Sequence, residues 1–361
     1  MTARRRGGPA TADVDRERFE RHLSRSEFYR YDGPPEDVEL VNRERRGALD
    51  VTDFRFMSVL PSGNAVNDVV TCRLFAPRGA PDTSRPVVFL HGLGLSRLSM
   101  WDSFVAALAR KGLPTLMVNL PYTCERRPPG MRRGFSYTST DSDVALPAYE
   151  QAVADVRSSL DLLLSGSYEL PVWTGQEVEP AIVGVSLGSF IGVIAAALDR
   201  RFRNLVCVLG GADLEIVVFR GSYRMIVKRQ LDQAGVRLEN RRRARAVYRD
   251  YLERVRESEH PLDVPAPYHF FLFDPLTFAS HLRSRPALLI NAHLDPIIPR
   301  SSARQLWLEM GKPDARWYLG THWAGGPWRP LVTGWIAGFL AGLEPGRNRT
   351  PKPSFAEPWA P

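Results

Sequence analysis

Residues 184–188 read Gly-Val-Ser-Leu-Gly and join an apolar, strand-like run (180–183) to an apolar, helix-like run (190–198). A sharp turn between a strand and a helix lifts a serine hydroxyl clear of the sheet, and only small flanking residues fit such a strained turn. We therefore expect Ser186 to be a nucleophile, and a serine nucleophile indicates attack on an acyl carbonyl. The alternative is a serine that merely caps the following helix, but a cap explains neither flanking glycine.

A nucleophilic serine needs a general base and an acid that orients the base, and after such a turn they follow in the order serine, acid, histidine. Asp295 comes just after the strand-like run 286–292, and His322 follows the last run of this kind. We expect His322 to be the base and Asp295 to fix its tautomer. Asp213, after an earlier strand-like run, is the alternative acid, because an acid after either of two neighbouring strands can reach the same imidazole.

A second glycine-rich turn, residues 91–94, reads His-Gly-Leu-Gly and also follows a strand-like run. Turns of this kind expose backbone N–H groups, which can stabilise the oxyanion of a tetrahedral intermediate. We expect the N–H groups of Leu93 and Leu187 to form this oxyanion hole. The spacing of His91 favours an imidazole that holds the loop over a second base. The residues expected to support the two turns are His91, Gly92, Gly184 and Gly188.

The elements that must position these residues alternate along the chain. Short apolar runs with the length of buried strands are 86–90, 116–120, 180–183, 204–209, 286–292 and 315–319. Segments with an apolar helical face include 145–164, 190–198, 240–257 and 301–310. Residues 54–79 alternate and break at 61–64, which predicts a hairpin of edge strands. Strands that alternate with helices favour an α/β protein with a parallel sheet.

Together, the turn at 91–94, the serine turn, the Asp295 loop and His322 resemble the alpha/beta-hydrolase superfamily, in its serine-nucleophile branch, over roughly residues 54–343. The resemblance implies the alpha/beta-hydrolase fold, which is an α/β fold with an eight-stranded, mostly parallel sheet and helices on both faces. Residues 274–277, Asp-Pro-Leu-Thr, are similar to a segment of dienelactone hydrolase-like and acyl-peptidase-like members. An esterase-like member is the other assignment within this branch.

The chain is long enough for one catalytic domain with an insertion, since it has 361 residues, of which 44% are hydrophobic. We expect a polar N-terminal arm (1–35), a hydrolase domain (36–343) and a proline-rich, disordered tail (344–361). The stretch from about 214 to 283 lacks parallel-strand character. At that point in such folds an insertion usually forms a cap over the site, and the helical face at 240–257 predicts a helical cap.

This cap carries most of the positive charge. Residues 224–256 hold eleven basic and four acidic side chains, and the whole chain has a net charge of +8. One hypothesis is that the cap recruits an anionic substrate or an acidic membrane surface. The loop arginines that would add to this field are Arg126, Arg127, Arg132 and Arg133. The alternative is a solvated helix face in an arginine-rich chain.

The remaining features indicate an intracellular enzyme. No signal peptide opens the chain, and no apolar stretch reaches the length of a membrane-spanning helix. The three cysteines have unrelated spacings, so we expect a reduced, cytoplasmic protein without a metal site. Phe219, Tyr223, Tyr268, Phe270 and Phe271 suggest an apolar acyl pocket or simply core.

The function that the sequence favours is hydrolysis of a carboxylic ester or related acyl bond through an acyl-enzyme, without a cofactor. We expect a small-molecule acyl substrate, apolar or anionic, and no nucleic acid; the oligomeric state stays open. Two alternatives remain, a non-catalytic binding protein with the same fold and a peripheral membrane protein that uses the basic cap helix.

Overall fold

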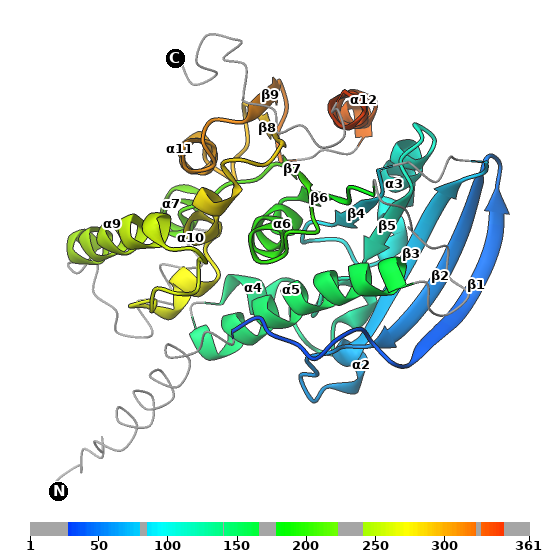
Figure 1. The fold of residues 1–361 in the computed structure, drawn as a ribbon, viewed down its shortest axis with the longest axis horizontal. Helices are drawn as coiled ribbons and strands as arrows, with labels where there is room; N and C mark the ends of the chain where they lie inside the picture. Colours follow the sequence, from blue (N-terminus) through cyan, green and yellow to red (C-terminus); the bar gives the residue numbers. More distant parts are fainter. Residues whose placement is uncertain are drawn as a thin grey trace, which may run out of the picture.

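A nine-stranded sheet forms the centre of the molecule, in the order β1-β2-β3-β5-β4-β6-β7-β8-β9 (Figure 1). The computed structural model describes residues 28–79, 85–139, 141–165, 178–222, 241–322 and 326–342. The strands are β1 (Val38–Arg46), β2 (Leu49–Met57), β3 (Val69–Pro77), β4 (Val87–Leu90), β5 (Thr115–Val118), β6 (Ala181–Val185), β7 (Asn204–Val208), β8 (Ala287–Ala292) and β9 (Asp314–Tyr318). The sheet thus has one strand more than the eight expected.

The six strand-like runs of the sequence are confirmed as β4 to β9, which pair in parallel. The predicted hairpin is confirmed as β2 and β3, which are antiparallel neighbours, and β3 pairs antiparallel with β5. Its expected place at the edge of the sheet is wrong, because β1 pairs with the outer side of β2. Strand β1 was not predicted. Most of its residues are exposed, so it lacks the apolar run that marks the other strands, and only its antiparallel pairing with β2 defines it.

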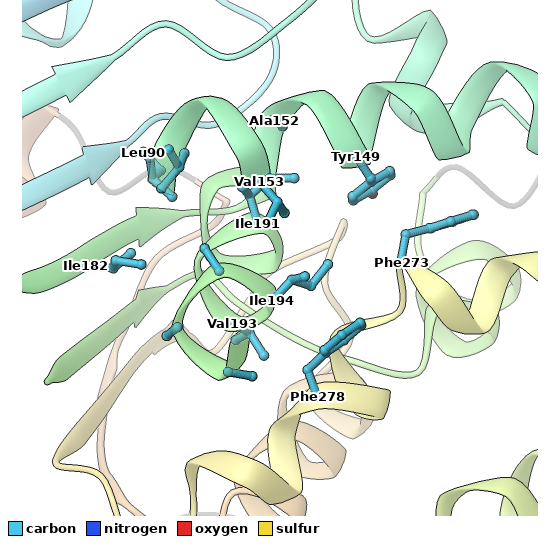
Figure 2. Packing of buried hydrophobic residues seen from close by; sticks show 14 of the residues in the cluster. Leu90, Tyr149, Ala152, Val153, Ile182, Ile191, Val193, Ile194, Phe273 and Phe278 are labelled. Atoms are coloured by element: carbon cyan, nitrogen blue, oxygen red, sulfur yellow. The ribbon is translucent and has the colours of Figure 1, made fainter. Parts of the chain in front are cut away.

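Helices cover both faces of the sheet because strand side chains alternate between two apolar clusters. On β4, Val88 and Leu90 join the cluster with α5 (Ser142–Ser165) and α6 (Leu187–Leu198). Val87 and Phe89 join the cluster with α3 (Asp102–Ala109) and α12 (Arg329–Ala341). Figure 2 shows the first cluster, in which side chains of α5 and α6 meet Phe278.

The described helical segments between β7 and β8 lie at the end of the sheet opposite β1 (Figure 1). They are α7 (Leu214–Arg220), α9 (Arg241–Glu257), η4 (His269–Leu272), α10 (Pro275–Ala279) and η5 (Ser280–Leu282). The apolar stripe predicted for α9 is buried at Tyr248, Tyr251, Leu252 and Val255. Residues 223–240, which hold four of the eleven basic residues between positions 224 and 256, lie outside the described residues.

The other short elements are α2 (Ala65–Asp68), η1 (Leu98–Trp101), η2 (Cys124–Arg126), α4 (Phe135–Thr138), α11 (Arg300–Glu309) and η6 (Gly326–Trp328). Cys72, Cys124 and Cys207 are buried, free thiols. Residues 1–27 of the expected arm and the whole expected tail lie outside the described residues. Among the helices that the structure describes, none is both long and apolar enough to cross a bilayer.

Candidate active site

Ser186 lies at the turn between β6 and α6 and has a left-handed backbone, with φ 52° and ψ −113°. The two flanking glycines allow this turn. A Cβ on Gly184 would lie 2.2 Å from the carbonyl oxygen of Gly188, and a Cβ on Gly188 would lie 2.0 Å from that of Leu90. Any larger residue at either position would collide with backbone, which explains why glycine stands at both positions.

The hydroxyl of Ser186 contacts His322, which follows β9. The distance from Ser186 Oγ to His322 Nε2 is 2.8 Å, and His322 Nδ1 lies 2.7 Å from Asp295 Oδ2. The side chains of His322 and Asp295 are 14% and 3% exposed, so the pair is largely shielded while Ser186 stays partly accessible. The structure therefore brings together the three residues that the sequence singled out, from three separate loops.

The carboxylate of Asp295 is held by its own loop. Its Oδ1 accepts hydrogen bonds from the N–H groups of Ile297 and Ile298, at 2.8 and 2.9 Å. These bonds occupy one oxygen and leave Oδ2 for the Nδ1–H of His322. An ionised carboxylate in this place favours the tautomer whose Nε2 can accept the serine proton.

Asp213, the alternative acid, has other partners. It caps α7 by accepting from the N–H of Ile216, and its Oδ2 lies 3.0 Å from Arg245 Nη2. Burial raises the pKa of this carboxyl above its usual range, and Arg245 partly offsets the shift. Its own N–H donates to Asp274, whose carboxylate also accepts from Leu214 and fixes the end of the β7 loop. Asp213 thus anchors the first helix of the insertion.

The glycine-rich loop after β4 lies against the serine turn. A Cβ on Gly92 would lie 3.3 Å from Ser186 Cβ, so the backbone of this loop borders the nucleophile. His91 is fully buried, with Nδ1 2.9 Å from the Gly92 carbonyl oxygen and Nε2 3.2 Å from the N–H of Leu120. Burial lowers the pKa of His91 to about 4. The imidazole is therefore neutral at pH 7, donates from Nδ1 and accepts at Nε2.

This bond sets the direction of one peptide group. In a trans peptide the C=O and the following N–H point in opposite directions, and no cis bond occurs among the described residues. Because the Gly92 carbonyl faces His91, the N–H of Leu93 points away from the imidazole. Leu187 is the first residue of α6, so its N–H lacks an intrahelical partner. Neither N–H group is therefore used in the hydrogen bonds of its own helix or strand.

Two supporting residues escaped the sequence analysis. Ser189 is buried, and its hydroxyl donates to the carbonyl oxygens of Gly184 and Val208, which joins the serine turn to β7. Glu125 accepts from the N–H of Leu98 and from the Asn119 amide, which joins the loops after β4 and β5. A lone serine and a lone glutamate carry no spacing signal, so only the folded structure reveals these contacts.

The aromatic residues suggested for an acyl pocket have mixed positions. Phe271 stacks on Tyr248 and Tyr251 of α9, with ring centroids 4.0 and 5.2 Å apart. Phe270 and Tyr268 pack edge-on against the same ring. Phe271 therefore lies in the core of the insertion, Phe270 is partly buried, and Tyr268 is 40% exposed. Tyr223 lies outside the described residues.

Comparisons with known proteins agree with this architecture. Residues 87–356 match the alpha/beta hydrolase family. An acetyl xylan esterase from Paenibacillus sp. R4 superposes with a TM-score of 0.59 at 17% identity, over 93% of this chain and 96% of the esterase. Acetyl xylan esterase 1 from Thermoanaerobacterium sp. JW/SL YS485 gives 0.57 at 17% identity, over 91% and 93%. A cold-adapted esterase from an Arctic intertidal metagenomic library gives 0.50 at 13%, over 86% and 99%. No curated protein matches the sequence.

Proposed function

Because the chain belongs to the alpha/beta hydrolase family, we propose that it is a serine hydrolase that cleaves a carboxylic ester or a related acyl bond. One observation carries this proposal: Ser186 Oγ, His322 and Asp295 form a continuous chain of two contacts, 2.8 and 2.7 Å long. This is the geometry that a serine needs to lose its proton as it attacks a carbonyl. Two of the structural neighbours are acetyl xylan esterases, which favours an ester as the substrate.

In the proposed cycle, Ser186 Oγ bonds to the acyl carbon while His322 Nε2 takes the hydroxyl proton. Asp295 stabilises the imidazolium, and the N–H groups of Leu93 and Leu187 bind the oxyanion. Collapse of the tetrahedral intermediate breaks the bond to the leaving alcohol, which takes the proton from His322. Water then attacks the acyl-enzyme with the same base, and the acid is released with Ser186 restored. The cycle uses only groups of this chain, the substrate and water.

We expect Ser186→Ala and His322→Ala each to lower the kcat for a short-chain ester by about 10^4-fold or more, because the members of such a unit act together. A fluorophosphonate probe should label wild type and leave Ser186→Ala unlabelled. Ser103→Ala, at an exposed serine of α3, is the control that should still be labelled. Circular dichroism checks that each variant is folded.

The two alternative functions, a non-catalytic binding protein and a peripheral membrane protein, can also be tested. Folded wild type that neither reacts with the probe nor hydrolyses esters would favour a binding protein built on this fold. Probe labelling that survives in Ser186→Ala would remove Ser186 from the proposed mechanism. Co-sedimentation with anionic liposomes at two salt concentrations tests the peripheral membrane protein.

A further inference from the structure

The loops beside Leu93 carry exposed arginines that face no carboxylate. We propose that the substrate of this site bears a negatively charged group, a carboxylate or phosphate, and that Arg133 binds this group with help from Arg97 and Arg132. The proposal rests on the proposed acyl-transfer function and adds the chemical class of its substrate.

Arg133 touches the loop that would hold the oxyanion. Its Nη1 lies 3.5 Å from the carbonyl oxygen of Gly94, the residue that directly follows Leu93. A Cβ on the adjacent Gly134 would lie 3.3 Å from Leu93 Cδ1, so the two loops are in contact. Chain geometry then places the guanidinium within about 10 Å of the Leu93 N–H. Arg133 thus lies within the length of a small substrate from the reacting carbonyl.

The charge of these arginines is not neutralised by the protein. Arg97, Arg132 and Arg133 are exposed, and among the described residues no carboxylate lies within ion-pair distance of any of them. Glu125 is the only acidic residue between positions 103 and 140. Its carboxylate already accepts from the N–H of Leu98 and from Asn119. A substrate anion would therefore provide the missing counter-charge.

Three other arginines of the predicted positive field, Arg126, Arg245 and Arg256, have carboxylate partners. Arg126 is only 1% exposed and pairs with Asp155 at 2.8 Å, so the expectation that it adds to the surface field is wrong. Within α9, Arg245 pairs with Asp213 at 3.0 Å, and Arg256 pairs with Glu309 at 2.7 Å. These side chains hold the insertion in place. Among the described residues, the loops after β4 and β5 carry exposed arginines next to Leu93 that have no carboxylate partner.

A small apolar cluster lies on the helix that follows the nucleophile. One helical turn after Ser186, Phe190 packs with Val217 of α7 and Ile298 of the Asp295 loop. A charged group would lose hydration there without gaining a partner, whereas guanidinium groups bind carboxylate and phosphate oxygens in a planar, bidentate manner. The apolar cluster and the arginine loops differ in chemistry, so we expect the anionic end of a substrate to bind at Arg133.

Monoesters of short dicarboxylic acids match this spacing. A four-carbon diacid accepts one hydrogen bond at each end. It then spans roughly 10 Å from an N–H group of the oxyanion hole to the guanidinium that binds its carboxylate. Monoethyl succinate and ethyl butyrate therefore form a suitable pair of probes, because they share a four-carbon acyl chain and an ethanol leaving group. Only the first carries a terminal carboxylate. Acid release in a pH-stat measures both.

We expect wild type to have a higher kcat/KM for monoethyl succinate than for ethyl butyrate. Arg133→Gln should lower the ratio of the two values about 10-fold, since a hydrogen bond to a charged group contributes about 1.5 kcal/mol. Adding Arg97→Gln and Arg132→Gln should lower it further. The preference should also weaken as salt is raised.

Arg110→Gln is the matched control. Arg110 is exposed and directly follows α3, at the end of the parallel strands that is opposite to Ser186. It should leave the ratio and both rates unchanged. An equal kcat/KM for the two esters in wild type, or the same ratio in Arg133→Gln as in wild type, would overturn the substrate class while the hydrolase stands. Absence of Ser186-dependent hydrolysis of both esters would instead overturn the proposed function. If the variants lose binding to anionic vesicles but keep the wild-type ratio of the two kcat/KM values, Arg97, Arg132 and Arg133 bind a membrane surface and the proposed substrate class is wrong.

Discussion

Asp295 and Asp213 have different partners, and these partners determine which carboxylate can act on His322. Asp295 keeps one oxygen in a loop and the other on the imidazole. Asp213 caps α7 and pairs with an arginine of α9. A carboxylate orients an imidazole only by direct contact, so we propose Asp295 as the acid of the triad.

Asp295→Asn should lower kcat by about 10^3- to 10^4-fold, because an amide in this place favours the wrong imidazole tautomer. Asp213→Asn should cost far less activity, since it alters a helix cap and an ion pair. Steady-state kinetics on one ester compare the two directly. A larger loss in Asp213→Asn would refute the assignment of Asp295.

At the residue scale, the sequence was informative where chemistry requires a residue type at a defined place. Ser186 and His322 follow recognisable strands, and the glycines beside Ser186 mark a turn that other residues cannot form. Arg126 was misjudged because its charge looks the same in the sequence whether it lies on the surface or against Asp155. Burial of a long polar side chain depends on distant elements that no local pattern reveals.

At the element scale, the loop after β4 is positioned by the loop after β5. His91 joins the two, because its Nδ1–H donates to Gly92 and its Nε2 accepts from Leu120. The sequence predicted a structural role for His91 from its place in the turn. It could not identify Leu120 as the partner, since that contact depends on β4 and β5 lying side by side. Strand β1 was missed for a related reason, as pairing rather than apolar patterning defines it.

His91→Ala should lower the kcat for a short ester by about 10- to 100-fold and change KM little, because the Leu93 N–H would lose its fixed direction and an oxyanion donor acts in the transition state. His293→Ala is the control, since that ring packs beside Trp317 with centroids 5.2 Å apart. Unchanged kcat in a folded His91→Ala protein would show that the loop after β4 keeps its conformation without the imidazole. A rise in KM alone would indicate a substrate contact instead.

At the scale of the whole molecule, the N-terminal strap (residues 28–31) joins the sheet-covering helices to the insertion. The Tyr29 hydroxyl donates to the carbonyl of Leu272, its ring meets Phe278, and its carbonyl accepts from Arg157 of α5. We propose that the chain comprises an arm (1–35), a hydrolase domain (36–343) and a tail (344–361), in which residues 214–283 form a cap. The strap would then fix this cap on α5.

Tyr29→Ala should lower the free energy of unfolding by about 3–5 kcal/mol, because the ring is only 1% exposed and its removal leaves a cavity between α5 and α10. Tyr29→Phe removes only the hydroxyl and leaves the Leu272 carbonyl without that donor, so it should cost about 1 kcal/mol. Tyr268→Ala, at a tyrosine that is 40% exposed, should cost clearly less than Tyr29→Ala. Denaturant titrations of the four proteins give these differences. Ester hydrolysis well below the unfolding transition should stay near wild type in Tyr29→Phe, since the strap makes no contact with Ser186 or His322. Equal losses for the buried and exposed tyrosines would show that the strap does not hold the insertion.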